Sequence, residues 1–512
     1  MRGEWLFRIL GLVDADLIEE AGTASSAFKR RTPWRRMLAA AACLTVLAAG
    51  AGWAALGGLD FTGGGNAGSA APGEAPPADG NAAFLSYAGP VLPLTTAEPD
   101  AALTAERAVT WDFSPTAAPD GTLRQWGAAV TDRYTLYNST ESDVTAALLY
   151  PFTGSLSELA ALRPDITADG APVAAALVTG GYAGSFRDAG AGDGSTWNLR
   201  SPTAWTDYQA LLADGGYLNQ ALSPDPLPDL PVTVYTFTDS TAPEDFDAAT
   251  QAIALSIDET RTTILTYGFN GMEWEGGFRR YSYFVPDGRR AEPDTKMLVV
   301  LGDDIGDYAL QGYQNGACEA GNELAGVTCT VTRRTSTLTE VLDQLCGDYL
   351  EQRSAADGTS MDLLPPGLFQ REAAALLVRY GLLSEDPVDR YGDGRLDDLL
   401  GEVLTMKRVL YLSFSVTVPA GGSAAVEARC WKEPSYDFGG SGTGREGLQG
   451  YDLALYLGST LRFTAQTAAL AHPEQVRLVE QTLGLDPEGG VWEAVLDPAQ
   501  EHCGLTIQTP EP

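Results

Sequence analysis

Apolar residues follow three different patterns along the chain. Between residues 37 and 59 they lie in one stretch that contains no charged residue. From about residue 130 they alternate with polar residues in short runs, which is typical of strands with one buried face. Over residues 338–345 and 369–380 they recur every three or four positions, which indicates amphipathic helices. The pattern predicts one long apolar segment followed by a mostly β region with a helical part.

The alternating runs predict antiparallel strands joined by tight turns. One run holds Tyr134 and Leu136 and the next reaches Tyr150, so we expect a hairpin that turns at residues 138–142. The Asp169-Gly170 pair between two later runs suits a type I′ turn. Several further runs follow over the last hundred residues, at the spacing of a β-sandwich.

Aromatic residues are concentrated in one predicted hairpin. A run that ends at Asn270-Gly271 is followed by a returning strand over residues 278–285, and the hairpin carries Trp274, Tyr281 and Tyr283. Aromatic rings on an exposed sheet face would suit stacking on sugar rings or contact with a protein partner. Packing in the core is the alternative use of the same side chains. These three residues are the candidate binding surface.

Helix signals occur at three places. Thr337 and Glu340 have the spacing of a capping box ahead of an apolar run, and a second amphipathic helix from about Phe369 is closed by Gly381. Ser201-Pro202 has the cap and first-turn residues of a third helix. We expect the first two helices to be structural.

The uncharged segment is long enough to cross a membrane. Its 23 residues reach about 34 Å as a helix, against a hydrocarbon core of roughly 30 Å. The cations clustered at residues 29–36 favour a cytoplasmic N-terminus, so we predict a transmembrane helix over residues 37–56. A cleaved signal with a site at Ala49-Gly50-Ala51 is one alternative, but the segment before it is longer than such signals usually are. A buried helix of a soluble protein is another, and it fits poorly because no polar face interrupts the segment.

Composition divides the rest of the chain around this span. The predicted parts are a cytoplasmic leader (1–36), the transmembrane helix (37–56), a flexible Gly/Ala/Pro linker (57–83), a β-rich domain (84–239), a mixed β-hairpin and helical region (240–406) and a C-terminal β domain (407–512). The two short helices expected in the leader are too short to be stable alone, so they would order on a partner protein or on the membrane surface. The predicted fold class is α+β with a mostly β ectodomain of antiparallel, sandwich-like sheets, plus the one N-terminal transmembrane helix.

Charge and cysteine content limit the partners. Residues 37–512 carry 26 Lys and Arg against 63 Asp and Glu, and this negative field argues against nucleic acid as a partner. Five cysteines lie beyond the span, at positions 318, 329, 346, 430 and 503. An odd number of widely spaced cysteines does not indicate a disulfide scaffold. Cys318 and Cys329 could bridge a hairpin or remain free thiols.

Residue types that carry catalysis are scarce. His472 and His502 are the only histidines, the cysteines lack a Cys-x-x-Cys spacing, and no Gly-Lys-Ser or Gly-Lys-Thr sequence follows a glycine-rich stretch. We therefore predict a protein without a cofactor that is not an enzyme. Carboxylate pairs of the kind that cleave glycosidic bonds are too numerous to single out, because only their separation in space is diagnostic.

One acidic segment partly resembles a calcium loop. Asp389, Asp393, Gly394 and Asp397 fall at loop positions one, five, six and nine. Positions three and twelve, however, are Tyr391 and Leu400, which offer no carboxylate. A solvated turn at the start of the next helix is the favoured interpretation.

Three stretches resemble a known group of proteins. Residues 9–21, followed by the basic cluster and the apolar span, resemble the leader of uncharacterised single-pass, membrane-anchored extracytoplasmic proteins of clostridia-like Gram-positive bacteria. Residues 134–152 and 450–464 resemble segments of their extracytoplasmic regions. The resemblance implies a place in the cell envelope and supplies no activity. Some membrane proteins of this layout are anti-sigma regulators, but residues 1–36 lack the His and Cys that the zinc-binding form of their cytoplasmic domain needs.

These observations lead to one expected function and two alternatives. We expect a non-catalytic protein of the cell membrane, with its C-terminal region outside, that senses or binds an envelope component and reports to a cytoplasmic protein through residues 1–36. The first alternative is a glycan- or protein-binding module of the cell surface, and the second is an envelope hydrolase.

Overall fold

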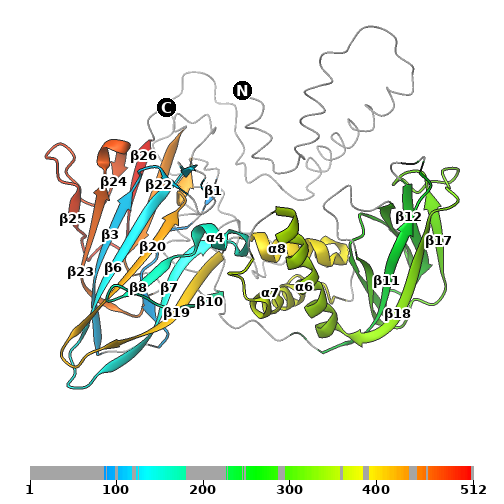
Figure 1. Cartoon of the computed structure of the whole chain (residues 1–512), viewed down its shortest axis with the longest axis horizontal. Helices are drawn as coiled ribbons and strands as arrows, with labels where there is room; N and C mark the ends of the chain where they lie inside the picture. Colours follow the sequence, from blue (N-terminus) through cyan, green and yellow to red (C-terminus); the bar gives the residue numbers. More distant parts are fainter. Residues whose placement is uncertain are drawn as a thin grey trace, which may run out of the picture. The chain divides into compact units, whose positions relative to one another are not determined.

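The chain is a mostly β protein of several antiparallel sheets with a smaller helical part, as the computed structural model in Figure 1 shows. It describes residues 86–508 except residues 88, 99–101, 118–120, 122, 125, 180–226, 228, 245, 247–248, 286–294, 358–360, 385–390, 407, 438–446 and 457–458. The predicted leader, span and linker and the helix expected at Ser201-Pro202 lie outside this part of the chain. Within it, no helix is both long enough and apolar enough to cross a membrane.

Three sheets form a unit that we call the terminal β unit, built from residues 86–179 and 408–508. Its seven-stranded sheet has the order β25-β23-β3-β6-β20-β8-β9, with bounds Glu493–Val495, Arg462–Ala471, Leu103–Asp112, Ala128–Asn138, Ser423–Lys432, Asp165–Ala168 and Ala171–Pro172. A four-stranded sheet has the order β10-β19-β7-β2, with bounds Ala176–Thr179, Arg408–Val418, Val144–Gly154 and Thr95–Thr96. A five-stranded sheet has the order β1-β21-β22-β26-β24, with bounds Ser86–Tyr87, Tyr436–Asp437, Leu448–Ala454, His502–Gln508 and Arg477–Gln481. A separate two-stranded ribbon joins β4 (Thr116–Ala117) to β5 (Leu123–Arg124).

Two hydrophobic cores lie along one face of the seven-stranded sheet. Alternate residues of β3 point to that face, and Leu103 and Ala105 share a core with β7 and β19 of the four-stranded sheet. Val109 and Trp111, further along the same strand, share a second core with β22 and β26 of the five-stranded sheet. Between the two pairs stands a charged residue, Arg107, which therefore lies where one covering sheet gives way to the other.

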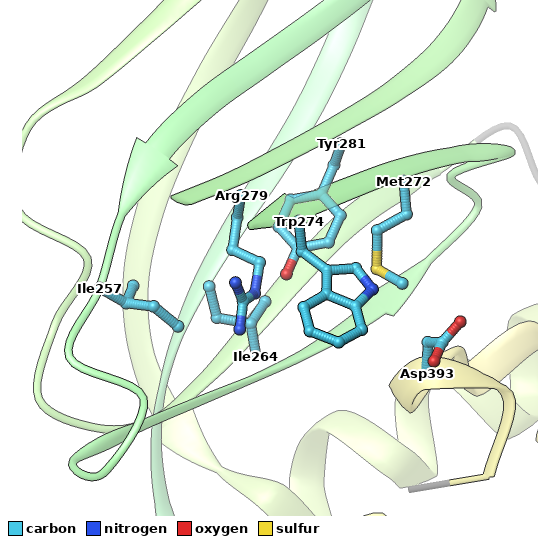
Figure 2. A pocket seen from close by; sticks show the side chains of 7 residues that line it. All are labelled: Ile257, Ile264, Met272, Trp274, Arg279, Tyr281 and Asp393. Carbon is cyan, nitrogen blue, oxygen red and sulfur yellow. The ribbon is translucent and has the colours of Figure 1, made fainter. Parts of the chain in front are cut away.

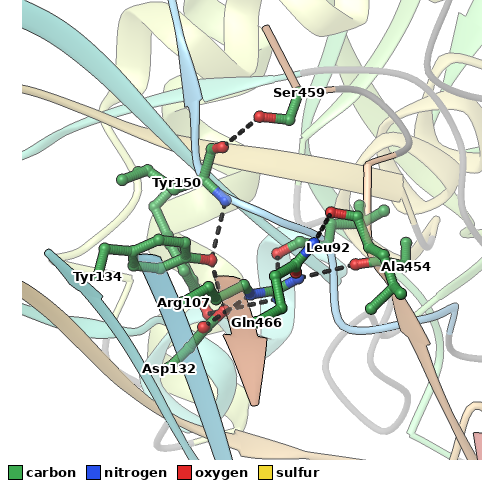
Figure 3. Close-up of polar contacts among 10 residues, drawn as sticks. Leu92, Arg107, Asp132, Tyr134, Tyr150, Ala454, Ser459 and Gln466 are labelled. Atoms are coloured by element: carbon green, nitrogen blue, oxygen red, sulfur yellow. Dashed lines mark hydrogen bonds and ion pairs between the residues drawn. The ribbon is translucent and has the colours of Figure 1, made fainter. Parts of the chain in front are cut away.

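At this junction Arg107 is the centre of a buried network of hydrogen bonds (Figure 3). Its guanidinium forms a two-pronged ion pair with Asp132 of β6, at 2.9 and 2.8 Å, and both side chains are fully buried. It also donates to the backbone carbonyls of Leu92 (3.3 Å) and Ala454 (2.7 Å). Tyr134 donates to the carboxylate at 2.7 Å. Burial by itself would lower the pKa of Arg107, but the charge of Asp132 raises it above its ordinary value, so the guanidinium stays charged.

The predicted hairpin at residues 138–142 is wrong, although both of its strands exist. β6 pairs with β3 and β20, whereas β7 pairs with β19 and β2, so the chain crosses from one sheet to another between them. The connection from β19 to β20 makes the same kind of crossing. The amide of Asn138 joins the two crossings, donating to the carbonyls of Ser142 (2.8 Å) and Val418 (3.1 Å). Alternation indicates a buried face and leaves the pairing partner open.

The strand pairing also differs from the predicted division of residues 84–512. Strands from residues 84–239 and 407–512 form common sheets, in which β6 pairs with β20, β7 with β19 and β3 with β23. β11 begins at Pro231, inside the first of these ranges, but it pairs with strands of the middle region. Because backbone pairing can join strands hundreds of residues apart, composition along the chain does not reveal such a shared sheet.

The middle region begins with two four-stranded sheets, which we call the central β unit (residues 231–337). One sheet has the order β13-β16-β11-β18, with bounds Thr262–Tyr267, Lys296–Gly302, Pro231–Thr241 and Thr328–Thr337. The other has the order β14-β15-β12-β17, with bounds Gly271–Glu275, Phe278–Val285, Ala249–Ser256 and Tyr308–Tyr313. Side chains from both sheets share one aromatic-rich core that includes Phe237, Phe269 and Tyr283.

Helices follow the central β unit and pack on its first sheet. They are α6 (Leu338–Asp357), α7 (Pro366–Arg379) and α8 (Leu396–Thr405), and short helical turns occur at η1 (Leu156–Glu158), α4 (Leu159–Leu162), η4 (Tyr391–Gly394) and η5 (Pro473–Gln475). The capping box is confirmed, because Glu340 N donates to Thr337 Oγ1 at 3.3 Å and Thr337 N to the Glu340 carboxylate at 3.4 Å. Gly381 ends α7 in a left-handed conformation, as predicted. The turn at Asp169-Gly170 is confirmed too, since both residues have positive φ and join β8 to β9.

Candidate functional site: a slot beside Trp274

The β14–β15 hairpin presents a half-exposed tryptophan at the edge of its sheet. β14 is an edge strand, and its register places Met272 opposite Tyr281 and Trp274 opposite Arg279. Strand alternation puts these four side chains on the face that carries core residue Tyr283 further along β15. Near the turn, however, this face is no longer covered by the core, and Trp274 keeps 49% of its surface exposed.

A small slot opens at this margin of the core (Figure 2). It is lined by Ile257, Ile264, Met272, Trp274, Arg279, Tyr281 and Asp393. Its volume of about 30 Å³ is enough for one or two water molecules or a single small substituent. A ligand would therefore place one group in the slot and leave the rest of its mass on the open surface.

Arg279 fixes the indole and contributes little net charge to the slot. Its guanidinium carbon lies 5.6 Å from the centre of a Trp274 ring, within the range of a cation–π contact. Nη1 donates to the carbonyls of Gly276 and Phe278, and Nη2 forms an ion pair with Glu259. The ion pair offsets the positive charge, and these contacts hold the guanidinium in place beside the ring.

Asp393 reaches the slot from a distant part of the sequence. It lies in η4 with a left-handed φ of 54°, followed by Gly394 at 82°. A Cβ added to Gly394 would stand 3.2 Å from the carbonyl oxygen of Ile264, so the absence of a side chain lets η4 approach β13 this closely. The next residue, Arg395, forms a β-bridge with Thr266 of β13, which secures the same contact.

The carboxylate of Asp393 is exposed and forms no hydrogen bond or ion pair with any other residue that the structure describes. Arg395, two residues further along the chain, forms ion pairs with Asp397 and Asp398. In Figure 2, Arg279 and Asp393 lie on either side of the indole. The slot thus combines a half-exposed aromatic ring with a carboxylate that no described residue pairs.

The structure separates the three aromatic residues predicted from the sequence. Trp274 is half exposed, but Tyr281 and Tyr283 are buried, with 3% and 1% of their surface exposed. Tyr281 forms part of the slot wall, whereas the Tyr283 hydroxyl lies 2.9 Å from Ser240 Oγ inside the unit. Tyr281 and Tyr283 pack in the core that the two sheets share, so a flat platform of three exposed rings does not form.

The sequence did not indicate Arg279 or Met272 as site residues, and no pattern around them marks a binding role. Asp393 was noted, but as part of the calcium-like segment. Asp389 of that segment lies outside the described residues, and within them no group of three His, Cys, Asp or Glu side chains could hold a metal ion. Two sequence signals more than a hundred residues apart, the aromatic hairpin and the acidic turn, therefore meet in one slot.

A larger recess lies on the other face of the sheet, because Thr263 and Leu301 in its wall face the helices, whereas Ile264 of the slot faces the second sheet. Ile257 and Ile264 line the slot, and residues 259–263 between them line a recess of about 380 Å³. The other walls of the recess are Leu230, Pro231, Leu301, Gly302 and Leu383. This volume is within the range of sites for small molecules. The recess is therefore a hollow separate from the slot.

The described thiols do not have the character of catalytic nucleophiles. Burial raises the pKa of Cys318 and Cys329, and raises it to about 12 for Cys346 and Cys430 and to about 11 for Cys503. All five are free of disulfides. A thiol with a raised pKa carries almost no thiolate at neutral pH and is a poor nucleophile.

Comparison of the chain with models of known protein families finds no match, and comparison with curated proteins finds none either.

Proposed function

We propose that the protein is a non-catalytic, membrane-anchored component of the cell envelope that binds a surface glycan through the slot beside Trp274. The observation that carries the proposal is a half-exposed indole in cation–π contact with Arg279, in a slot that also holds the carboxylate of Asp393, which no described residue pairs. Aromatic rings stack on the apolar faces of sugars, and neighbouring polar groups accept hydrogen bonds from hydroxyl groups. The two-sheet arrangement of the central β unit, which we take to be a sandwich, supplies the rigid support.

Two buried carboxylates support a non-catalytic role, because each has a structural partner. Asp132 forms an ion pair with Arg107, and Glu372 forms one with Arg408 and accepts a hydrogen bond from Thr179.

A glycan array probed with the full-length protein tests this proposal. Micelles of an uncharged polyoxyethylene detergent are suitable, because they carry no sugar. We expect binding that Trp274→Ala abolishes and Trp126→Ala preserves; Trp126 is a matched control, because it is 48% exposed and lies in the terminal β unit. Equal loss in both variants, binding to peptides in place of glycans, or release of new reducing ends during incubation would each overturn the proposal.

The membrane anchor rests on the apolar segment at residues 37–56 and its basic flank. Protease added to intact cells should digest residues 84–512 and leave a membrane-bound fragment that contains residues 1–36. Recovery of the whole chain in the soluble fraction, resistant to that protease, would contradict the anchor. If residues 1–36 capture a cytoplasmic protein in a pull-down, that result supports the reporting role. If they capture none, the reporting role is refuted.

A further inference from the structure

We propose that the Trp274 slot recognises a protonated amine on its ligand, with the ammonium group placed between the indole and the carboxylate of Asp393. This inference rests on the proposed glycan-binding function and specifies the chemical class of the group that enters the slot. It depends on three features of the site: charge, size and ring chemistry.

Charge is the first feature. The positive charge of Arg279 is offset by Glu259, and that of Arg395 by Asp397 and Asp398. Asp393 is left as a charge that no described residue compensates. A cationic group beside it would form the ion pair that the protein itself does not supply.

Size is the second feature. A volume of about 30 Å³ excludes a sugar ring or an aromatic side chain but admits one ammonium group. A neutral N-acetyl group is larger and brings no charge. The slot therefore favours a free amine over its acetylated form for both reasons.

The aromatic ring is the third feature. The face of a tryptophan ring attracts cations, and an exposed contact of this kind is worth about two- to fivefold in affinity. The whole chain carries a net charge of −35, which raises the local concentration of cations around the site. Ring and carboxylate thus act in the same direction on the same group.

The test uses a sugar backbone with and without the charge. Full-length protein labelled with 5-fluorotryptophan, in the same polyoxyethylene micelles, is titrated with a β-1,4-linked glucosamine tetramer and with its fully N-acetylated form. The ¹⁹F resonance of Trp274 is assigned by its loss in Trp274→Phe. At about pH 5.5, between the pKa of a carboxylic acid and that of an amine, we expect the free amine form to bind at least about fivefold more tightly.

Variants identify the charge responsible. Asp393→Asn should remove the preference for the amine and weaken binding of the glucosamine tetramer about fivefold, the effect of one ion pair in a watery setting. Asp239→Asn is the matched control, because Asp239 is also an exposed aspartate with a left-handed φ, of 52°. It should leave the preference unchanged.

The remaining outcomes separate this inference from the proposed function. Equal binding of the two tetramers, with loss in Trp274→Ala, would overturn amine recognition and keep a glycan-binding site. Binding of tetralysine with the same dependence on Asp393, and none of either sugar, would overturn the glycan and keep the amine. No shift of the Trp274 resonance with any of the three probes would overturn both.

Discussion

The buried ion pair between Arg107 and Asp132 offers the sharpest test of what holds the terminal β unit together. We consider Arg107→Met, which keeps much of the apolar stem and removes the guanidinium. The change removes both bonds to Asp132 and leaves the carbonyls of Leu92 and Ala454 without their donor. Asp132 keeps the Tyr134 hydroxyl at 2.7 Å and a longer contact with Tyr150 at 3.4 Å.

The magnitude follows from burial. Both side chains are fully buried, so the carboxylate left behind cannot regain the hydration that it had in the unfolded chain. Breaking such a pair by removing one partner costs about 3 to 5 kcal/mol. Each orphaned carbonyl adds a cost of its own unless water reaches it. We therefore expect the free energy of unfolding of the terminal β unit to fall by at least about 3 kcal/mol.

Urea unfolding of the full-length chain, followed by ¹⁹F NMR of 5-fluorotryptophan, measures the loss locally. Trp111 is fully buried in the terminal β unit and reports on its unfolding, and Trp274 reports separately on the central β unit. The matched control is Arg133→Met, which removes the ion pair between Arg133 and Glu427 in the same sheet. The side chain of Arg133 is 61% exposed. An exposed pair of this kind contributes about 0 to 1 kcal/mol.

A double variant separates the charge from the packing. Arg107→Met with Asp132→Leu leaves no buried charge, so it should be more stable than Arg107→Met alone by about 1 to 3 kcal/mol. A single variant that costs less than about 1 kcal/mol, or a double variant whose cost is the sum of the two single costs, would refute the reasoning.

Three further predictions concern the crossings, the pH response and the slot. Asn138→Ala should destabilise the terminal β unit by about 1 to 3 kcal/mol, because the buried carbonyl of Val418 loses this donor and the link to Ser142 is lost, and a Trp111 transition shifted by less than about 0.5 kcal/mol would contradict that role. The hydrogen bond from Arg133 lowers the pKa of Glu427, so the pair stabilises the fold above the unfolded pKa near 4.5 and loses this effect as the pH falls through the lower folded value. Glu427→Gln should therefore be less stable than the natural chain at neutral pH, by less than about 1 kcal/mol, and equal to it in strong acid; a gap that persists in urea titrations there would be inconsistent with this sign. Gly394→Ala should weaken binding of the glucosamine tetramer by pushing η4 away from Ile264, with the Trp111 transition unchanged, whereas Gly421→Ala, which also has a positive φ but meets no atom within 4 Å, should bind normally; equal binding by both variants would remove Gly394 from the site.

Local features of the fold were predictable because their causes lie within a few residues. The hydroxyl of Thr337 caps α6 by accepting a hydrogen bond from the backbone N–H of Glu340, three residues further along. The chain turns between β8 and β9 at Asp169-Gly170 because those two residues tolerate positive φ. The mostly β character followed from the alternation of apolar and polar residues in the same way. Each of these signals is a property of the backbone and its nearest side chains.

Pairing and exposure were decided by tertiary structure. β6 reads as one half of a hairpin with β7, yet it bonds to β3 and β20, because the partner is chosen by which edges and faces must be covered in the whole unit. Tyr283 and Trp274 are both aromatic residues of one predicted hairpin, so the sequence does not distinguish them. In the structure Tyr283 is buried in the core between the two sheets, whereas Trp274 lies outside that core and is half exposed.

The same division holds for the candidate site. The sequence by itself determined that an aromatic hairpin and an acidic, glycine-containing turn exist, and that the chain is strongly negative. Only the packing of η4 against β13 brought Asp393 to the indole of Trp274, more than a hundred residues away. Contacts at such separation depend on how every intervening strand is paired, and no local pattern of residues encodes that.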